Sequence, residues 1–345
     1  SAMPNKALEW ETSTQLELGF DLGLFNNRLR ITTDYYKKKT TDLLYSVAVP
    51  ATSGYQTMLK NIGSIENQGY ELSIESDNLT GAFSWTTAFN IAFNRNKVLE
   101  LGGEEYKEMA EGDGHLKTGS VRRLIVGEPI GVFYGYRFDG IFQNEEECKQ
   151  QTSSASPIGV GLRRYKDLNG DGKVDAANDR EILGDANPKF FGGLTNTFAY
   201  KGFELNVFLQ YSYGNKILNY NAMELENPTG GQNAYADMVN RWTPENPYSE
   251  GPRTWDRENQ YWINNDNTYF MRNANYLRLK NIELGYTFNF EGLKKAGISN
   301  LRLYTNGTNL ITIDGVKDAD PEQRDASLGG YPLRKIINFG VQATF

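Results

Sequence analysis

The chain has 345 residues, with 43 acidic and 36 basic side chains and a formal net charge of −7 at pH 7. This acidic balance argues against a nucleic-acid partner, and the single cysteine, Cys148, excludes an internal disulfide. Aromatic residues make up 13% of the chain, with 35 Gly beside them, a composition that favours strands and turns over helices.

The first predicted element is a strand at residues 10–24, WETSTQLELGFDLGL. Apolar residues and threonines alternate there with polar residues and glycines from Trp10 to Leu24. Successive side chains of a strand point to opposite faces, so this strand has one apolar and one polar face. Asn26 and Asn27 form a hairpin signal, and a second alternating strand follows at 29–36.

The same alternation recurs along the rest of the chain and predicts an all-β, antiparallel fold of about ten strands. The chain shows no apolar run long enough for a transmembrane helix and opens on no signal peptide. The further strands are predicted at 70–75, 83–94, 132–138, 194–200, 203–213, 282–288, 301–303 and 337–345.

Strand length and loop asymmetry favour a transmembrane β-barrel. Several strands exceed 10 residues, and a tilted strand needs about 9–11 to cross a bilayer. Short turns alternate with long loops, as in outer-membrane barrels with their long extracellular loops. A soluble β-sandwich or secreted lectin, with its apolar faces packed together, is the alternative. The short turns are expected at 26–27, 77–81 and 201–202, and the long loops at about 46–64, 99–125, 144–186, 215–270 and 312–332.

The segment DLNGDGKVDAAND, residues 167–179, begins like a calcium-binding loop. Its acidic and amide residues stand at loop positions 1, 3, 5 and 9, with Gly172 at 6. The last acid, Asp179, comes one place late, and Asn178 stands at position 12. The flanking sequence predicts strands and loops, not the helices of an EF-hand. We expect Ca²⁺ or a similar hard cation; the alternative is a hydrogen-bonded turn without metal. The predicted ligands are Asp167, Asn169, Asp171, Lys173, Asp175 and Asp179.

Several blocks in order resemble the C-terminal part of the SusC/RagA family of TonB-dependent outer-membrane transporters of Bacteroidota. The resemblance covers nearly the whole chain. The blocks are LEWETSTQLELGFDLGLFNNRLRITTDYYKKKTTDLL, NIGSIENQGYELSIE, DLNGDGKVDAANDREILGDANPKFFGGLTNTFAYKGFELNVFLQYSYG, YLRLKNIELGYTF, RLYTNGTNL and the final FGVQATF.

This resemblance implies a section of a 22-stranded barrel that closes around a plug. It also implies import of oligosaccharides or peptides across the outer membrane of a Gram-negative bacterium. The partners would be TonB, contacted through a missing N-terminal part, and a SusD-like lipoprotein that caps the extracellular mouth. The plug, the TonB-contacting segment and about half of the barrel would lie outside residues 1–345, so we expect no transport by this section alone.

Three groups of residues are candidates for roles in such a barrel. The outward strand faces would contact outer-membrane lipid, with Trp10, Trp85, Tyr211 and Tyr213 as candidates for interfacial aromatic girdles. In the long loop 215–270, aromatic side chains could stack on sugars or contact the lid, or pack within the loop. The candidates for substrate or lid contact are Trp242, Trp255, Tyr261 and Trp262. The candidates for a barrel-assembly signal are Phe339 and Phe345.

Catalysis has little support in the sequence. No nucleophile elbow, phosphate-binding loop or zinc motif is present, and the single His115 stands in a sequence typical of loops. We therefore expect no enzyme. The alternative to a transporter section is a secreted calcium-dependent glycan-binding β-domain.

Overall fold

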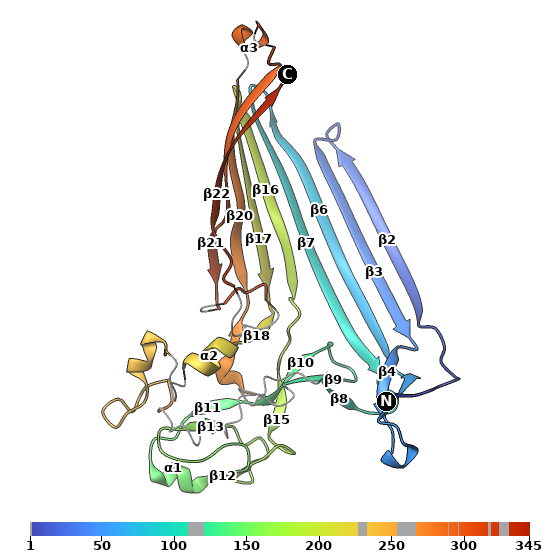
Figure 1. The fold of residues 1–345 in the computed structure, drawn as a ribbon, viewed down its shortest axis with the longest axis vertical. Coiled ribbons are helices and arrows are strands. Elements are labelled where there is room, and N and C mark those ends of the chain that lie inside the picture. Colours follow the sequence, from blue (N-terminus) through green and yellow to red (C-terminus); the bar gives the residue numbers. More distant parts are fainter. Residues whose placement is uncertain are drawn as a thin grey trace.

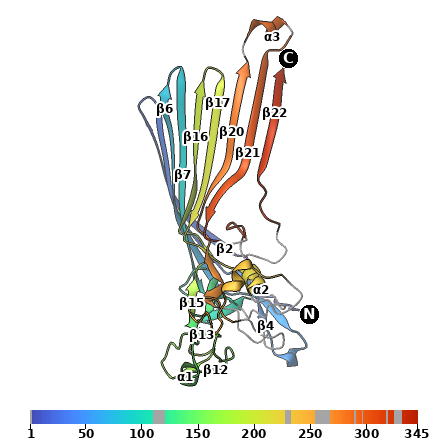
Figure 2. The ribbon, with the colours of Figure 1, turned by 90° about the vertical axis from the view of Figure 1, so that its left-hand side faces the viewer.

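The main element of the computed structural model is an antiparallel sheet of nine strands, counted in the part of the chain that the structure describes. That part is residues 2–109, 121–226, 233–253, 267–288, 290–295, 297–316, 319–323 and 331–345. The strands follow one another as an up-and-down meander in a single curved wall (Figures 1 and 2). In order they are β2 (Thr12–Leu24), β3 (Leu29–Thr41), β6 (Ser64–Thr80), β7 (Phe83–Glu100), β16 (Phe190–Tyr200), β17 (Phe203–Tyr213), β20 (Tyr276–Phe288), β21 (Asn300–Asp314) and β22 (Ile336–Thr344).

These strands are 9 to 18 residues long, enough for each to cross a bilayer at a tilt. The predicted all-β barrel section is therefore confirmed. No helix in the described part of the chain is long and apolar enough to span a membrane.

The two ends of the wall carry different connections (Figure 1). One end has tight turns, such as the one in which Asn26 and Asn27 both adopt positive φ, and the segment 289–299 with helix α3 (Glu291–Lys295). The other end has four long connections. The predicted asymmetry is confirmed, and the chain's C-terminus lies at the short-turn end. The long connections are 42–63, 101–189, 214–275 and 315–335.

The prediction that residues 132–138 form a strand of the barrel is wrong, because these residues do not belong to the wall. It forms β10 (Val132–Tyr136) and β11 (Phe138–Ile141), within the single connection that runs from β7 to β16. Val132 and Phe133 are both 1% exposed. Side chains on both faces of β10 are thus buried, whereas a strand of the wall leaves its faces to lipid and lumen. The expected loops at 99–125 and 144–186 are parts of this one connection.

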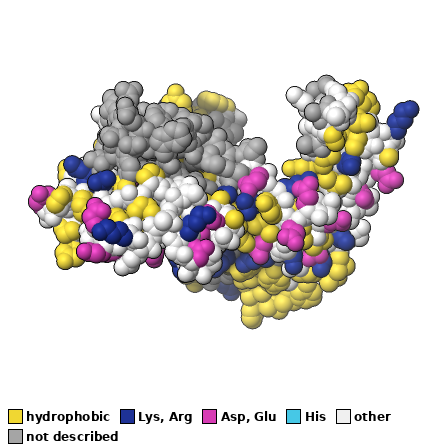
Figure 3. Space-filling model, turned by 90° about the horizontal axis from the view of Figure 1, so that it is seen from below, with side chains coloured by type: hydrophobic (Ala, Val, Ile, Leu, Met, Phe, Trp, Pro, Cys, Tyr) yellow, Lys and Arg dark blue, Asp and Glu magenta, His cyan; other side chains and the backbone are white. Residues whose placement is uncertain are grey.

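Alternation along the wall gathers apolar side chains on its outward face. Leu194 of β16 stands in register with Phe89 of β7 and Leu209 of β17. At the β2 edge, Leu18 and Phe20 are largely exposed on this face. Viewed from the long-loop end, a band of hydrophobic side chains lies along the lower edge of the view, and Lys, Arg, Asp and Glu side chains are scattered over the described surface next to it (Figure 3). This is the pattern of a barrel with lipid outside and a polar lumen.

Aromatic side chains form two belts on the outward face. Near the short turns, Trp85 and Phe198 stack at 5.7 Å; near the long loops, Phe190 stacks on Tyr213 at 5.2 Å and contacts Tyr211. Tyr200 also belongs to the belt near the short turns, with its ring 6.4 Å from that of Phe83. From Phe190 to Tyr200 the strand covers roughly 33 Å, or about 25 Å across a membrane at a tilt of about 40°. Trp85, Tyr211 and Tyr213 therefore lie in the belts, while Trp10 precedes β2 and is almost fully exposed.

The described residues of the connections 101–189 and 214–275 form a folded unit at the long-loop end, which we call the cap. A four-stranded sheet, β15-β10-β9-β8, lies beside helix α2 in it. Further elements of the long-loop end are β1 (Ala2–Met3), β4 (Leu44–Ala48), β5 (Thr57–Asn61), β8 (Tyr106–Met109), β9 (Arg122–Ile125), α1 (Glu145–Gln150), β12 (Thr152–Ser153), β13 (Arg163–Tyr165), β14 (Lys173–Val174), β15 (Arg180–Gly184), β18 (Lys216–Leu218), α2 (Tyr220–Leu225) and β19 (Met271–Asn273).

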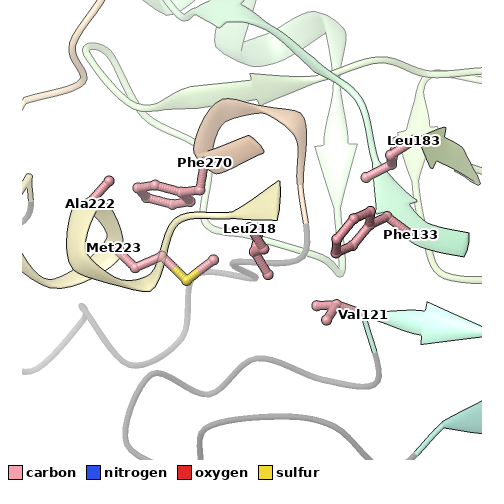
Figure 4. Close-up of a cluster of buried hydrophobic side chains, with 7 residues drawn as sticks. All are labelled: Val121, Phe133, Leu183, Leu218, Ala222, Met223 and Phe270. Atoms are coloured by element: carbon pink, nitrogen blue, oxygen red, sulfur yellow. The ribbon is translucent and has the colours of Figure 1, made fainter. Parts of the chain in front are cut away.

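The cap has its own hydrophobic core (Figure 4). Phe133 and Leu183 come from the first connection, and Leu218, Met223 and Phe270 from the second. The two connections are thus packed together as one unit, although some 30 residues or more separate their contributing segments. This packing holds the two connections together as one unit at the long-loop end of the wall.

Candidate functional site

A cavity of about 1180 Å³ opens in the cap. Its lining comes from four places: residues 138–143 around β11, Glu226 at the end of α2, residues 235–251, and residues 268–272, which run into β19. Cavities lined by aromatic and convergent polar groups are the usual sites for small ligands. This cavity is therefore the candidate site for ligand contact at the long-loop end.

Tyr269 anchors one wall of the cavity. Its ring stacks edge-on against Phe138 at 5.0 Å and against Phe270 at 4.9 Å. Burial, followed by the nearby negative charge of Glu226, raises the pKa of the Tyr269 phenol well above its ordinary value. The phenol is therefore a neutral hydrogen-bonding group throughout the physiological pH range.

The charged groups beside Tyr269 are paired with one another. Arg272 Nη2 lies 3.2 Å from Glu226 Oε1, and Nη1 donates to the Tyr269 carbonyl oxygen at 2.6 Å. Since both charges are partly buried and paired with each other, they hold the shape of this side of the cavity.

The stretch 235–251 contributes an exposed group to the rim of the cavity. Tyr248, one of the lining residues, is 94% exposed. The turn below Tyr248 is held by Asn246 Nδ2, which donates to the Asn240 carbonyl oxygen at 3.0 Å. An exposed aromatic ring on a hydrogen-bonded turn is a ready contact surface for a ligand. Tyr248 is not among the contact residues predicted from the sequence, although its position in the turn-forming stretch NPYSEG is a usable signal.

Trp242, a predicted contact residue, packs within the cap. It is 8% exposed, and its Nε1–H donates to Gln143 Oε1 at 3.3 Å. Its ring covers Gly161, where φ is +83° and a Cβ would overlap the indole. The structure thus favours the packing alternative for this tryptophan. The other three predicted contact residues, Trp255, Tyr261 and Trp262, lie outside the described residues, as does His115.

The acidic segment 167–179 lies in the first connection of the cap and is closed by hydrogen bonds. Asp167 accepts the backbone N–H groups of Gly170 and Gly172, both at 2.7 Å. Asp179 turns back into the loop and accepts the N–H groups of Leu168 at 2.8 Å and Asp175 at 2.7 Å. The late acid therefore does close the loop, but through backbone amides.

The remaining predicted ligands also bond within the segment. Asn169 Nδ2 donates to Asp171 Oδ2 at 2.9 Å, and Lys173 Nζ lies 2.9 Å from Asp175 Oδ2. This hydrogen bond raises the pKa of Lys173 and lowers the pKa of Asp175. The donor set is all oxygen, as hard cations prefer. Among the described residues, however, no group of three or more His, Cys, Asp or Glu side chains is arranged to hold a metal ion. A cation would have to replace some of these hydrogen bonds, and calcium binding stays a prediction.

The two predicted assembly residues lie at the free edge of the wall. Phe339 is on the outward face of β22, in register with Thr305 of β21, and Phe345 directly follows the strand. They are 84% and 86% exposed. Both are therefore accessible to lipid or to another protein.

Comparisons with known proteins agree on one family. Residues 1–310 match the family model described as TonB-dependent receptor-like β-barrel. The chain is 40% identical to TonB-dependent receptor P3 of Formosa agariphila, over 99% of the chain and 35% of that protein. It is 28% identical to TonB-dependent receptor SusC of Bacteroides thetaiotaomicron, over 99% of the chain and 32% of that protein.

A solved structure titled as the RagAB peptide transporter is similar over the whole wall and cap. The TM-score is 0.79 at 25% identity, and the match covers 100% of this chain and 36% of the chain of that structure. The chain spans about a third of the length of the curated relatives that it matches.

Proposed function

The chain belongs to the TonB-dependent receptor-like β-barrels of the Gram-negative outer membrane, of SusC/RagA type, and we propose that it is the barrel section of an importer. The whole protein would carry oligosaccharides or peptides across the outer membrane. The chain supplies part of the lipid-facing wall and an extracellular cap, and we propose no catalytic role for it.

One observation carries this proposal: a folded cap sits on the long-loop end of a wall whose aromatic belts are a bilayer's width apart. In the proposed orientation, the 1180 Å³ cavity faces the extracellular side. We propose that exposed groups of its rim, Tyr248 first among them, contact the substrate or a lid protein. A ring that is 94% exposed on the cap has the apolar face that sugars and aromatic peptide side chains both stack on.

We propose two protein partners for the whole transporter. A SusD-like lipoprotein would cover the extracellular mouth, and TonB would contact a part of the protein outside these residues. The support is the family membership and the similarity to SusC and to a RagAB transporter. Affinity purification of the full-length protein from outer membranes tests the first partner; recovery of no lipoprotein would reject it.

The alternative of a secreted glycan-binding domain does not fit the wall. That alternative requires the apolar strand faces to pack against one another, as in a β-sandwich. Here Leu18 and Phe20 of β2 and Phe339 and Val341 of β22 are exposed at opposite edges of one outward face. Such a face needs lipid to cover it.

Uptake by cells tests the proposed function. Fluorescent peptides and fluorescent oligosaccharides are offered to a strain with the full-length gene and to a deletion strain, each with and without a proton uncoupler. We expect uptake of one of the two probe classes to require both the gene and the proton gradient. Equal uptake of both classes by the two strains would reject the proposal.

A further inference from the structure

The segment 319–323 of the β21–β22 connection is tied to the inner side of the wall. Asp320 Oδ1 lies 2.7 Å from Nη2 of Arg278, and Glu322 bonds Nη1 of the same guanidinium. Arg278 stands on β20 between the outward-facing Leu277 and Leu279, so it points to the lumen. It is 1% exposed, whereas the side chains of Asp320 and Glu322 are 11% and 30% exposed, so the guanidinium is the buried partner of the two ion pairs.

The Glu322 carboxylate also contacts hydrogen-bond donors of two neighbouring strands. Gln210 of β17 donates to Oε1 at 2.8 Å, and the Tyr276 hydroxyl of β20 donates to the same oxygen at 3.1 Å. Lys280 Nζ of β20 lies 3.4 Å from Oε2. A loop that connects β21 to β22 is thereby fastened across β17 and β20, strands to which it is not joined in sequence.

Cavities lie on both sides of the fastened segment. One, of about 560 Å³, is bounded by β21 and residues 331–335; the other, of about 400 Å³, is bounded by the ends of β16 and β17. Pro321 and Gln323 line both cavities. The segment is therefore the partition between them.

We propose that residues 319–323 form a latch, held by the charge of Arg278, that separates two cavities at the extracellular end of the lumen. A buried arginine is tolerated only while its carboxylate partners compensate for its lost hydration. Removing the charge of one carboxylate therefore favours release of the segment from Arg278. This release joins the two cavities into one space. The role of this space in a passage rests on the proposed transport function.

Hydrogen exchange of the full-length protein in detergent tests the latch. The variant is Glu322→Gln, which keeps the side-chain shape and removes the charge. The matched control is Glu283→Gln, on the same strand as Arg278 but paired with Arg302 at 2.8 Å, away from the segment. We expect amide exchange within 319–323 to become at least about tenfold faster in the first variant and to stay unchanged in the control. Equal exchange in both variants would overturn the latch.

Hydroxyl-radical footprinting of the parent protein and both variants tests the partition. We expect oxidation of the side chains that line the two cavities to rise in Glu322→Gln and to match the parent in Glu283→Gln. Faster exchange without a change in oxidation would overturn the partition. Neither measurement needs a substrate, so a negative result leaves the proposed uptake untouched, and failure of the uptake assay leaves the latch untouched. Heat-modifiable gel migration confirms that each variant barrel is folded.

Discussion

At the scale of single residues, Tyr304 and Gly340 form a cross-strand pair that joins β21 to the edge strand β22. The tyrosine ring lies over the glycine, where a Cβ would overlap it. Gly340→Ala should therefore destabilise the full-length barrel by about 1–3 kcal/mol, because the ring must move to admit the methyl group. Urea unfolding in detergent measures this.

The same substitution in a Tyr304→Ala background supplies the control. Without the ring the added methyl group has room, so Gly340→Ala should cost much less there. An equal cost in both backgrounds would show that the tyrosine is not the cause.

The acidic segment 167–179 is closed either by a cation or by hydrogen bonds alone, and adding Ca²⁺ distinguishes the two. If the predicted site has an extracellular-type Kd of about 10⁻³ M, about 10 mM Ca²⁺ should add about 1.4 kcal/mol of stability, seen as a higher Tm of the full-length protein. Asp171→Ala should abolish the shift, and Asp139→Ala, an exposed acid elsewhere in the cap, should retain it. A Tm that Ca²⁺ does not move in the parent protein would leave the segment as a hydrogen-bonded turn.

At the scale of elements, β22 carries the exposed aromatic end of the chain. Phe345 follows a strand whose outward side chains are largely exposed. If it is part of an assembly signal, deleting Phe345 from the full-length transporter should lower the yield of folded barrel in the outer membrane. Quantitative blotting of outer-membrane fractions measures this, with Thr344→Ser as the control. Unchanged insertion would contradict the role.

The cap depends on one core built from two connections. Phe133 of β10 is 1% exposed and lies within the cluster of Figure 4. Phe133→Ala should destabilise the cap by about 3–5 kcal/mol through the cavity it creates. Because the wall does not contribute to this cluster, protease cleavage should rise in 101–189 and 214–275 while the barrel stays heat-modifiable. If heat-modifiable migration were lost together with the rise in cleavage, cap and wall would unfold as one unit.

At the scale of the whole molecule, the wall has one face for lipid and one for the lumen. Phe89 and Asn90 are neighbours on β7 and point to opposite faces, midway between the aromatic belts. Phe89→Arg should cost about 2–4 kcal/mol in the full-length protein, since it puts a charge at the bilayer midplane. Asn90→Arg should cost far less, because it points into the polar lumen. Unfolding of both variants in lipid vesicles measures the difference, and equal costs would contradict the assignment of faces.

The local pattern of the sequence determined the wall and its family, because strand side chains alternate with a period of two and lipid enforces that alternation on every strand. The same rule misplaced residues 132–138. Phe133, one of their apolar side chains, packs in the core of the cap, and residues far away in the chain complete this core.

The candidate sites also divide into those that the local sequence predicts and those that depend on long-range contacts. The motif of 167–179 can be read locally, and its residues do bond to one another. The packing of Trp242 over Gly161 and the contact of Glu322 with Arg278 each join segments distant in sequence. Only the tertiary structure decided them, because burial and ion pairing depend on which chain segments meet in space, and local periodicity does not carry that information.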